Sequence, residues 1–151
     1  MLNMREVLGR VSKLSGYTNM KDSDYREVVY CQKFSPASGG APTANMPQPF
    51  PVGAIVIGIL ASAAVPGAAP MTGRGRQCFE IDFGFTGGES LTIGGPVLAD
   101  ALLGGGDADI FPSKELVMAP NQQLNCRVAN VTNGLLDVYV AYHCLVYRLQ
   151  G

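Results

Sequence analysis

The chain of 151 residues has no tryptophan, a single histidine (His143) and few charged residues. Charged residues make up 15% of the chain, against about 25% in an average soluble domain, and the formal net charge is −1. A single histidine excludes a histidine-rich metal site, and the small net charge excludes the overall basic field that attracts nucleic acid. We therefore expect no cofactor and no nucleic-acid partner.

Long hydrophobic runs are also absent. The first residues, 1–7, contain no apolar stretch of the kind that a secretory signal peptide needs. The most apolar run, Val52–Val65, lies between Pro51 and Pro66 and is shorter than the roughly 20 residues of a membrane-spanning helix. We interpret this run as a buried core element and expect no membrane association.

The four cysteines contain no C-x-x-C pair, so their spacing fits neither a zinc site nor a dense disulfide scaffold. They are Cys31, Cys78, Cys126 and Cys144. Without a secretion signal, buried free thiols are the expected state. A disulfide between Cys126 and Cys144 is the open alternative, since the two can be neighbours in a C-terminal hairpin.

Glycine and proline, in contrast, are abundant, with 19 and 10 residues that punctuate short apolar segments. The segments with strand-like composition or alternation are residues 25–34, 54–61, 77–85, 90–93, 115–118, 124–131 and 136–149. An amphipathic helix is predicted over residues 2–14, and residues 97–103 are either one helical turn or a loop. This pattern predicts an all-β fold, an antiparallel β-sandwich of the jelly-roll or Greek-key type with a short N-terminal helix.

Residues 35–51 contain five prolines and two glycines but no charged residue, which is typical of an extended arm or a long loop. We therefore divide the chain at this segment. Residues 1–51 are expected to hold the N-terminal helix, a strand and the extended arm, and residues 52–151 the β-sandwich domain. The arm residues expected to form a clamp are Ala41, Pro42, Met46, Pro47 and Phe50, and the sequence leaves open whether the arm contacts its own subunit or a neighbouring one.

The last predicted strand, residues 136–149, is apolar on both faces. One face carries the alternate residues from Val138 to Val146, and the other includes Tyr139, Leu145 and Tyr147. Such a strand is either covered on both sides or turned toward another subunit. We predict that Tyr139, Leu145 and Tyr147 form a subunit contact.

No group of polar residues predicts a catalytic site, and we expect a protein that is not an enzyme. His143 and Cys144 are neighbours on a strand, so they point to opposite faces and cannot form a dyad with each other. The loop 104–109 (GGGDAD), with Asp100 nearby, offers carboxylates for a calcium ion, with solvated aspartates as the alternative.

A compact basic turn, Gly73-Arg74-Gly75-Arg76, is the one cationic feature that stands out. Its glycines allow a close backbone approach, and its guanidinium groups can bind carboxylates bidentately. We predict that Arg74 and Arg76 anchor an acidic partner surface, with a solvated loop as the alternative.

The C-terminal half has a recurring order of segments. The strand CFEIDFGF is followed by a glycine turn, by PSKELVMAP, by a strand ending in Arg127–Asn130 and by the final apolar strand. From about Phe79 to Leu149 this layout resembles small β-sandwich proteins of tailed-phage virions, such as capsid decoration and other accessory head proteins.

The resemblance implies a structural protein that self-associates, most often as a trimer, and stabilises the shell. Its partner is then the major capsid protein or another virion protein, and its location is the virion, assembled in the host cytoplasm. The alternative is a ligand- or carbohydrate-binding β-sandwich module for host recognition, which would carry aromatic and Asp or Asn residues in a cluster of loops.

Overall fold

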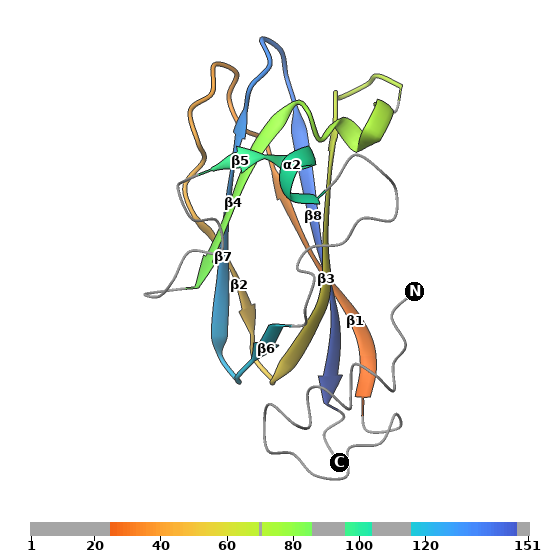
Figure 1. Ribbon diagram of the computed structural model, residues 1–151, viewed down its shortest axis with the longest axis vertical. Helices are drawn as coiled ribbons and strands as arrows, with labels where there is room; N and C mark the ends of the chain where they lie inside the picture. Colours follow the sequence, from red (N-terminus) through yellow and green to blue (C-terminus); the bar gives the residue numbers. More distant parts are fainter. Residues whose placement is uncertain (1–24, 70, 86–95, 104–115, 148–151) are drawn as a thin grey trace.

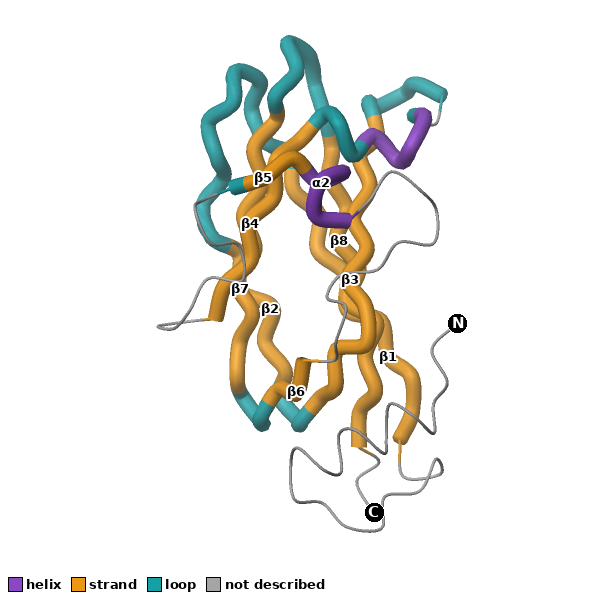
Figure 2. Tube along the Cα trace, viewed as in Figure 1, coloured by secondary structure: helices purple, strands orange, loops and turns teal. Residues whose placement is uncertain are grey.

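The computed structural model describes residues 25–69, 71–85, 96–103 and 116–147, which form two antiparallel sheets packed face to face (Figures 1 and 2). Sheet A has the order β1-β8-β3-β6, and sheet B the order β2-β7-β4-β5. The strands of sheet A are β1 (Tyr25–Phe34), β8 (Asp137–Tyr147), β3 (Ala54–Ala64) and β6 (Leu116–Met118). Those of sheet B are β2 (Met46–Phe50), β7 (Gln122–Asn130), β4 (Phe79–Phe85) and β5 (Val97–Leu98).

The strand order is that of a jelly roll. The first strand pairs with the eighth, the second with the seventh, the third with the sixth and the fourth with the fifth, all antiparallel. The chain therefore behaves as one long two-stranded ribbon that folds over itself, which is how two Greek keys combine in this architecture. The predicted all-β antiparallel sandwich is confirmed.

The core lies between the sheets and follows the period-two patterns of the strands. On β8, the alternate residues Val138, Val140, Tyr142, Cys144 and Val146 are all buried. Sheet B faces them with Phe79, Ile81 and Phe83 of β4 and Leu124, Cys126 and Val128 of β7, which are also buried. Removing these apolar faces from water supplies the main driving force for folding.

Tyr142 occupies the centre of this core. Its ring makes edge-on contacts with Phe50, at 6.4 Å between centroids, and with Phe83, at 6.3 Å. Its hydroxyl donates a 2.8 Å hydrogen bond to Oε1 of Gln32, so the buried polar atom is satisfied. Burial also raises the pKa of Tyr142, which keeps the hydroxyl protonated as a donor.

Most of the strands predicted from alternation are present within one to three residues of their expected ends. The apolar run Val52–Val65 contains β3, whose register shifts between Val56 and Gly58 at an irregularity next to Ile57. Residues 97–103 contain the short strand β5 followed by the helix α2 (Ala99–Leu103). In the described ranges, no helix has the length and apolar character needed to cross a membrane.

The predicted boundary at residues 51 and 52 does not separate two structural parts. β1 lies beside β8 in sheet A, and β2 lies beside β7 in sheet B, so both belong to the sandwich. The predicted N-terminal helix (2–14), the strand 90–93 and the aspartate-containing loop 104–109 lie outside the described residues.

Candidate interaction surface

The side of sheet A that points away from sheet B, which we call the outer face, is formed by the alternate residues of β1, β8 and β3. The register places Leu145 between Glu27 and Ile55, His143 between Val29 and Gly58, Ala141 between Cys31 and Leu60, and Tyr139 between Lys33 and Ser62. Two charged residues of β1, Glu27 and Lys33, thus lie at the two ends of an uncharged area.

Apart from His143, the middle of the outer face is apolar, and it is partly open to solvent. Val29 is 50% exposed and Tyr139 is 44% exposed. Cys31 is also exposed, and Leu60, Ala141 and His143 are half-buried. Exposed apolar side chains that lie together on a face favour contact with another protein surface.

The structure modifies the predicted subunit contact. Tyr139 has the exposure that such a contact needs, but Leu145 is only 1% exposed and lies beside Ile55, which is 4% exposed. Leu145 is therefore not available at the surface, and its assignment to a subunit contact is corrected. Tyr147 is the last residue of β8 and pairs with Tyr25, and its side chain lies outside the described part.

A polar cluster closes the Tyr139 end of the outer face. Ser35 Oγ donates a 2.7 Å hydrogen bond to Asp137 Oδ1, and Lys33 Nζ lies 3.8 Å from Asp137 Oδ2. The same ammonium lies 5.8 Å from the centroid of the Tyr139 ring. Contacts of this exposed kind contribute little to stability, about 1 kcal/mol or less each, but they orient Lys33 along the face.

The four edges of the described sheets differ in length and composition. In sheet B, β2 contains Pro47 and Pro49, and β5 has two residues. In sheet A, β6 has three residues, whereas β1 has ten and no proline. Short edges and prolines both discourage pairing with another chain, and β1 is the one terminal strand of the described sheets that has neither feature.

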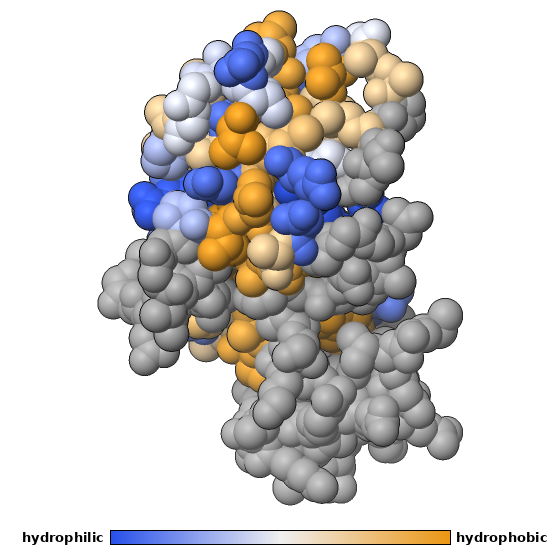
Figure 3. All heavy atoms as spheres, turned by 45° about the horizontal axis from the view of Figure 1, so that its top comes forward, coloured by the Kyte–Doolittle hydropathy of each residue, from blue (hydrophilic) through white to orange (hydrophobic). Residues whose placement is uncertain are grey.

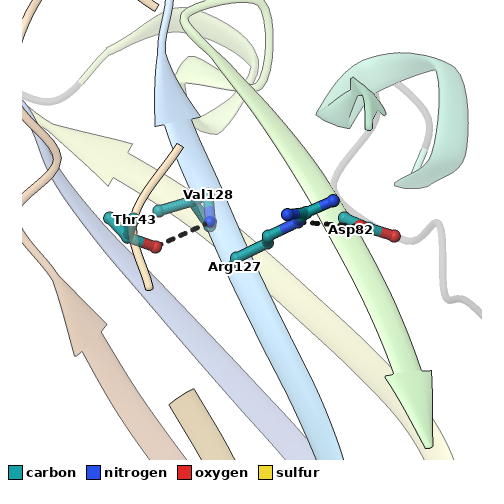
Figure 4. A network of polar contacts seen from close by, with 4 residues as sticks. All are labelled: Thr43, Asp82, Arg127 and Val128. Carbon is teal, nitrogen blue, oxygen red and sulfur yellow. Dashed lines mark hydrogen bonds and ion pairs between the residues drawn. The ribbon is translucent and has the colours of Figure 1, made fainter. Parts of the chain in front are cut away.

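The predicted clamping arm is built into its own sandwich. Gly40 N donates to Asn130 O at 2.9 Å, and Thr43 N donates to Val128 O at 2.8 Å. Figure 4 shows Thr43 beside β7, where its hydroxyl accepts a 3.1 Å hydrogen bond from Val128 N, while Arg127 reaches Asp82 on the neighbouring β4 at 3.0 Å. Residues 40–45 thus continue the line of β2 along β7.

The five predicted arm residues therefore have different positions. Phe50 is fully buried in the core, which corrects its assignment to a partner contact. Ala41, Pro42, Met46 and Pro47 are exposed on the β2 side of the sandwich. A partner contact of these four remains a prediction, and it would be made by a fixed edge of the sandwich rather than by a reaching arm.

Arg76 is also an internal residue rather than a surface anchor. Its side chain is buried, with Nε donating to Ala61 O at 3.0 Å and Nη1 donating to Leu103 O at 3.1 Å. The turn before it is tight, because Gly75 has φ 64° and an added Cβ there would lie 2.9 Å from Met71 Sδ. The anchor prediction for Arg76 is therefore wrong, and the one for Arg74, which is half-buried, stays a prediction.

The thiols are all free, so the alternative of a disulfide between Cys126 and Cys144 is not realised. These two residues are buried, as expected, whereas Cys78 is half-buried and Cys31 is exposed on the outer face. Desolvation raises the pKa of Cys144 to about 12 and raises that of Cys126 further, so neither is a thiolate at neutral pH. Across the described ranges, no group of three or more His, Cys, Asp or Glu side chains gathers as metal ligands would.

Sequence reasoning missed β2 and the exposed edge of β1. A signal for β2 was available, because prolines at alternate positions are compatible with an edge strand whose alternate N–H groups point away from the sheet.

Comparison with family models, curated proteins and solved structures gives no match for this chain.

Proposed function

We propose that this protein is a structural component of a virion, an accessory head protein of the capsid-decoration type that self-associates and stabilises the shell. The observation that carries the proposal is the apolar outer face of sheet A on a jelly-roll sandwich with very few charges. Such a face gains free energy when a neighbouring protein covers it. The proposed partners are further copies of the chain and the major capsid protein or another virion protein.

Exposed apolar residues on several sides of the molecule support an assembly role. In the space-filling view, hydrophobic side chains reach the surface in a central band between groups of hydrophilic ones (Figure 3). The large exposed hydrophobic residues of the described part are Val29, Met46, Val65, Leu98, Val117, Val131, Leu135 and Tyr139. They lie on several sides of the sandwich, as a subunit with more than one neighbour requires.

The jelly roll by itself does not decide between a capsid role and a lectin role, because both classes use it. The position of the aromatic residues favours the capsid role. Every aromatic residue of the described ranges lies in a strand, and the most exposed with a described side chain, Tyr139, lies on a sheet face. A carbohydrate-binding module would instead present aromatic rings from its loops.

The test is to ask whether the chain is part of purified particles. Particles from a culture that produces the protein are separated on a density gradient, and peptides of this chain are quantified by mass spectrometry against the major shell protein. We expect tens of copies or more per particle, retained after a high-salt wash. Presence in the lysate together with absence from intact particles would overturn the proposal.

A glycan array tests the competing function on the same material. Specific glycan binding by a protein that is absent from particles would favour the host-recognition module instead. Sedimentation of the purified protein then measures the subunit number, for which the resemblance to decoration proteins predicts three.

A further inference from the structure

The outer-face residues of β1 form a pattern that is complementary to itself. Along the strand they are Glu27, Val29, Cys31 and Lys33, which is an acid, two apolar residues and a base. Read in the opposite direction, the same strand presents a base, two apolar residues and an acid. An antiparallel neighbour with this sequence would therefore match it in charge and in apolar character at every position.

We propose that two copies of the chain pair through β1 in antiparallel fashion, with a twofold axis at Tyr30. This register places Glu27 opposite Lys33 of the second copy, and Lys33 opposite Glu27 of the second copy. It also places Val29 of each copy opposite Cys31 of the other copy, and the two Tyr30 residues opposite each other. A twofold contact of this kind uses the same surface on both subunits.

The register follows from two constraints. A shift by one residue would turn the outer face of one copy toward the core side of the other, because side chains alternate along a strand. A shift by two residues keeps the faces matched but places Glu27 opposite Cys31 or Ser35 of the second copy. Only the register centred on Tyr30 pairs each carboxylate with an ammonium.

The edge itself is suited to this pairing. β1 has ten residues and no proline, and its Glu27, Val29, Cys31 and Lys33 side chains are all exposed. Lys33 lies beside Tyr139 on one side, so the second copy's Glu27 would continue the same cross-strand row on its other side. Pairing would join the two four-stranded A sheets into one sheet of eight strands and satisfy the backbone groups of both edges.

On the core side of β1, the residue at the proposed twofold axis, Tyr30, is held in place by its neighbours. The Tyr30 ring packs edge-on against Phe50, with 5.4 Å between centroids. The next core-side residue, Gln32, donates from Nε2 to Met46 O at 3.3 Å. β1 is therefore held in a fixed position before it meets a second copy, which lowers the entropy cost of pairing.

Charge reversal tests the proposal in solution. Glu27→Lys and Lys33→Glu each put like charges opposite each other twice, and the double variant restores both pairs with their signs exchanged. In sedimentation experiments over a range of concentrations, we expect each single change to raise the dimer dissociation constant about tenfold or more, and the double variant to return within about threefold of the original.

These variants control for each other. From the formal net charge of −1, Glu27→Lys gives −1 + 2 = +1 and Lys33→Glu gives −1 − 2 = −3, so nonspecific repulsion between copies would weaken the dimer only in Lys33→Glu, whereas the proposed register predicts a loss in both. Lys33→Glu also removes the contact with Asp137, which the double variant does not restore, so recovery in the double variant reports the contact between copies. Thermal melting of each variant checks that the sandwich is intact.

A zero-length crosslink reads the register directly. Within one chain, Glu27 and Lys33 are about 20 Å apart along the strand, so a direct amide between them must join two copies. A mixture of ¹⁴N- and ¹⁵N-labelled protein is treated with a carbodiimide, which takes up the water lost as the amide forms. We expect a peptide pair of mixed label that joins Glu27 to Lys33.

A monomer at 100 µM or more, a trimer, a dimer indifferent to both charge reversals, or a crosslink at other residues would each overturn the proposal. The pairing concerns self-association alone and does not depend on a virion; it predicts a twofold dimer in place of the trimer that the resemblance predicts. A β1 dimer that never enters particles would contradict the proposed function alone, and a particle protein that fails these tests would contradict the pairing alone.

Discussion

The two edge strands on the same side of the sandwich are built in opposite ways. β2 interrupts its edge with Pro47 and Pro49, and residues 40–45 extend its line along β7. β1 packs over β2 through the contact of Tyr30 with Phe50, and it has neither prolines nor an extension that shields it within the described residues. One edge thus carries protection against strand addition that, among the described residues, its neighbour in the other sheet lacks.

This difference shows that edge protection depends on the sequence of each edge strand and not on the fold. A jelly roll of two separate sheets leaves four edges, and β5 and β6 avoid pairing by being short. An unprotected edge of ten residues is a liability in a monomer, because it invites aggregation. It becomes an advantage in a subunit that has a defined neighbour.

The largest expected change in the free energy of unfolding comes from a core residue of β2. Phe50→Ala removes a fully buried ring that contacts Tyr30 and Tyr142. We expect the free energy of unfolding, measured by urea titration, to fall by about 3–5 kcal/mol. Met46→Ala on the same strand is the control and should cost less than about 1 kcal/mol, since Met46 is partly exposed. Equal losses would show that β2 does not pack as described.

Alkaline pH should destabilise the fold through the two thiols that are buried in the core, Cys126 and Cys144. The folded protein keeps protons on Cys126 and Cys144 at a pH where the unfolded chain has lost them. Unfolding then releases protons, so the free energy of unfolding should fall above the ordinary thiol pKa of about 8.5 and continue to fall toward pH 12.

The expected slope is on the order of 1 kcal/mol per pH unit for each buried thiol. Urea titrations at a series of pH values measure it. Cys144→Ala should reduce this slope. A flat profile up to pH 11 would contradict the burial of the two core thiols.

A smaller loss in the free energy of unfolding is expected when the hydrogen bond that links the core to β1 is removed. Tyr142→Phe removes the donor to Gln32 Oε1 on β1 and leaves that buried oxygen unsatisfied. We expect a loss of about 1–2 kcal/mol in a urea titration and faster hydrogen exchange of the β1 amides. Tyr139→Phe, which changes an exposed ring on the same strand, should stay within about 0.5 kcal/mol.

Removing the prolines of β2 should have the smallest effect on the free energy of unfolding, but it should change how the protein associates. Pro47→Thr combined with Pro49→Thr restores two N–H groups on β2, and stability should change by about 1 kcal/mol or less. Sedimentation should then show additional association that depends on concentration. Pro66→Ala in an exposed turn is the control and should not associate further.

The fold was largely predictable because its strands carry strong local patterns. The alternation of Phe79, Ile81 and Phe83 identified β4 and its inward side before any pairing was known, and the two-sided apolar pattern of residues 136–149 identified β8. β2 escaped because MPQPF has no β-branched residue, and prolines lower strand propensity. Its strand conformation depends on the partner β7, which is distant in the sequence.

The interaction surface was predictable only in part, for the same reason. Tyr139 was identified from the two-sided apolar pattern of β8. The pattern does not show which residues of a face are buried by tertiary contacts, and Leu145 is one of those that are buried. Arg76 sits in a glycine-rich basic turn that is typical of solvent-exposed loops. Its burial depends on carbonyl groups of residues 61 and 103, which the fold brings to it from distant positions in the sequence.

The buried guanidinium of Arg76 has a consequence for how the chain matures on the ribosome. One of its carbonyl acceptors, on Leu103, is made 27 residues after Arg76 itself. Until that residue leaves the exit tunnel, the cation has to stay hydrated, because burying a charge with too few acceptors is costly. We therefore expect the segment between β3 and β4, together with the five-residue helix α2, which is too short to persist by itself, to become ordered only after Leu103 is available; hydrogen exchange on stalled nascent chains of increasing length would check this.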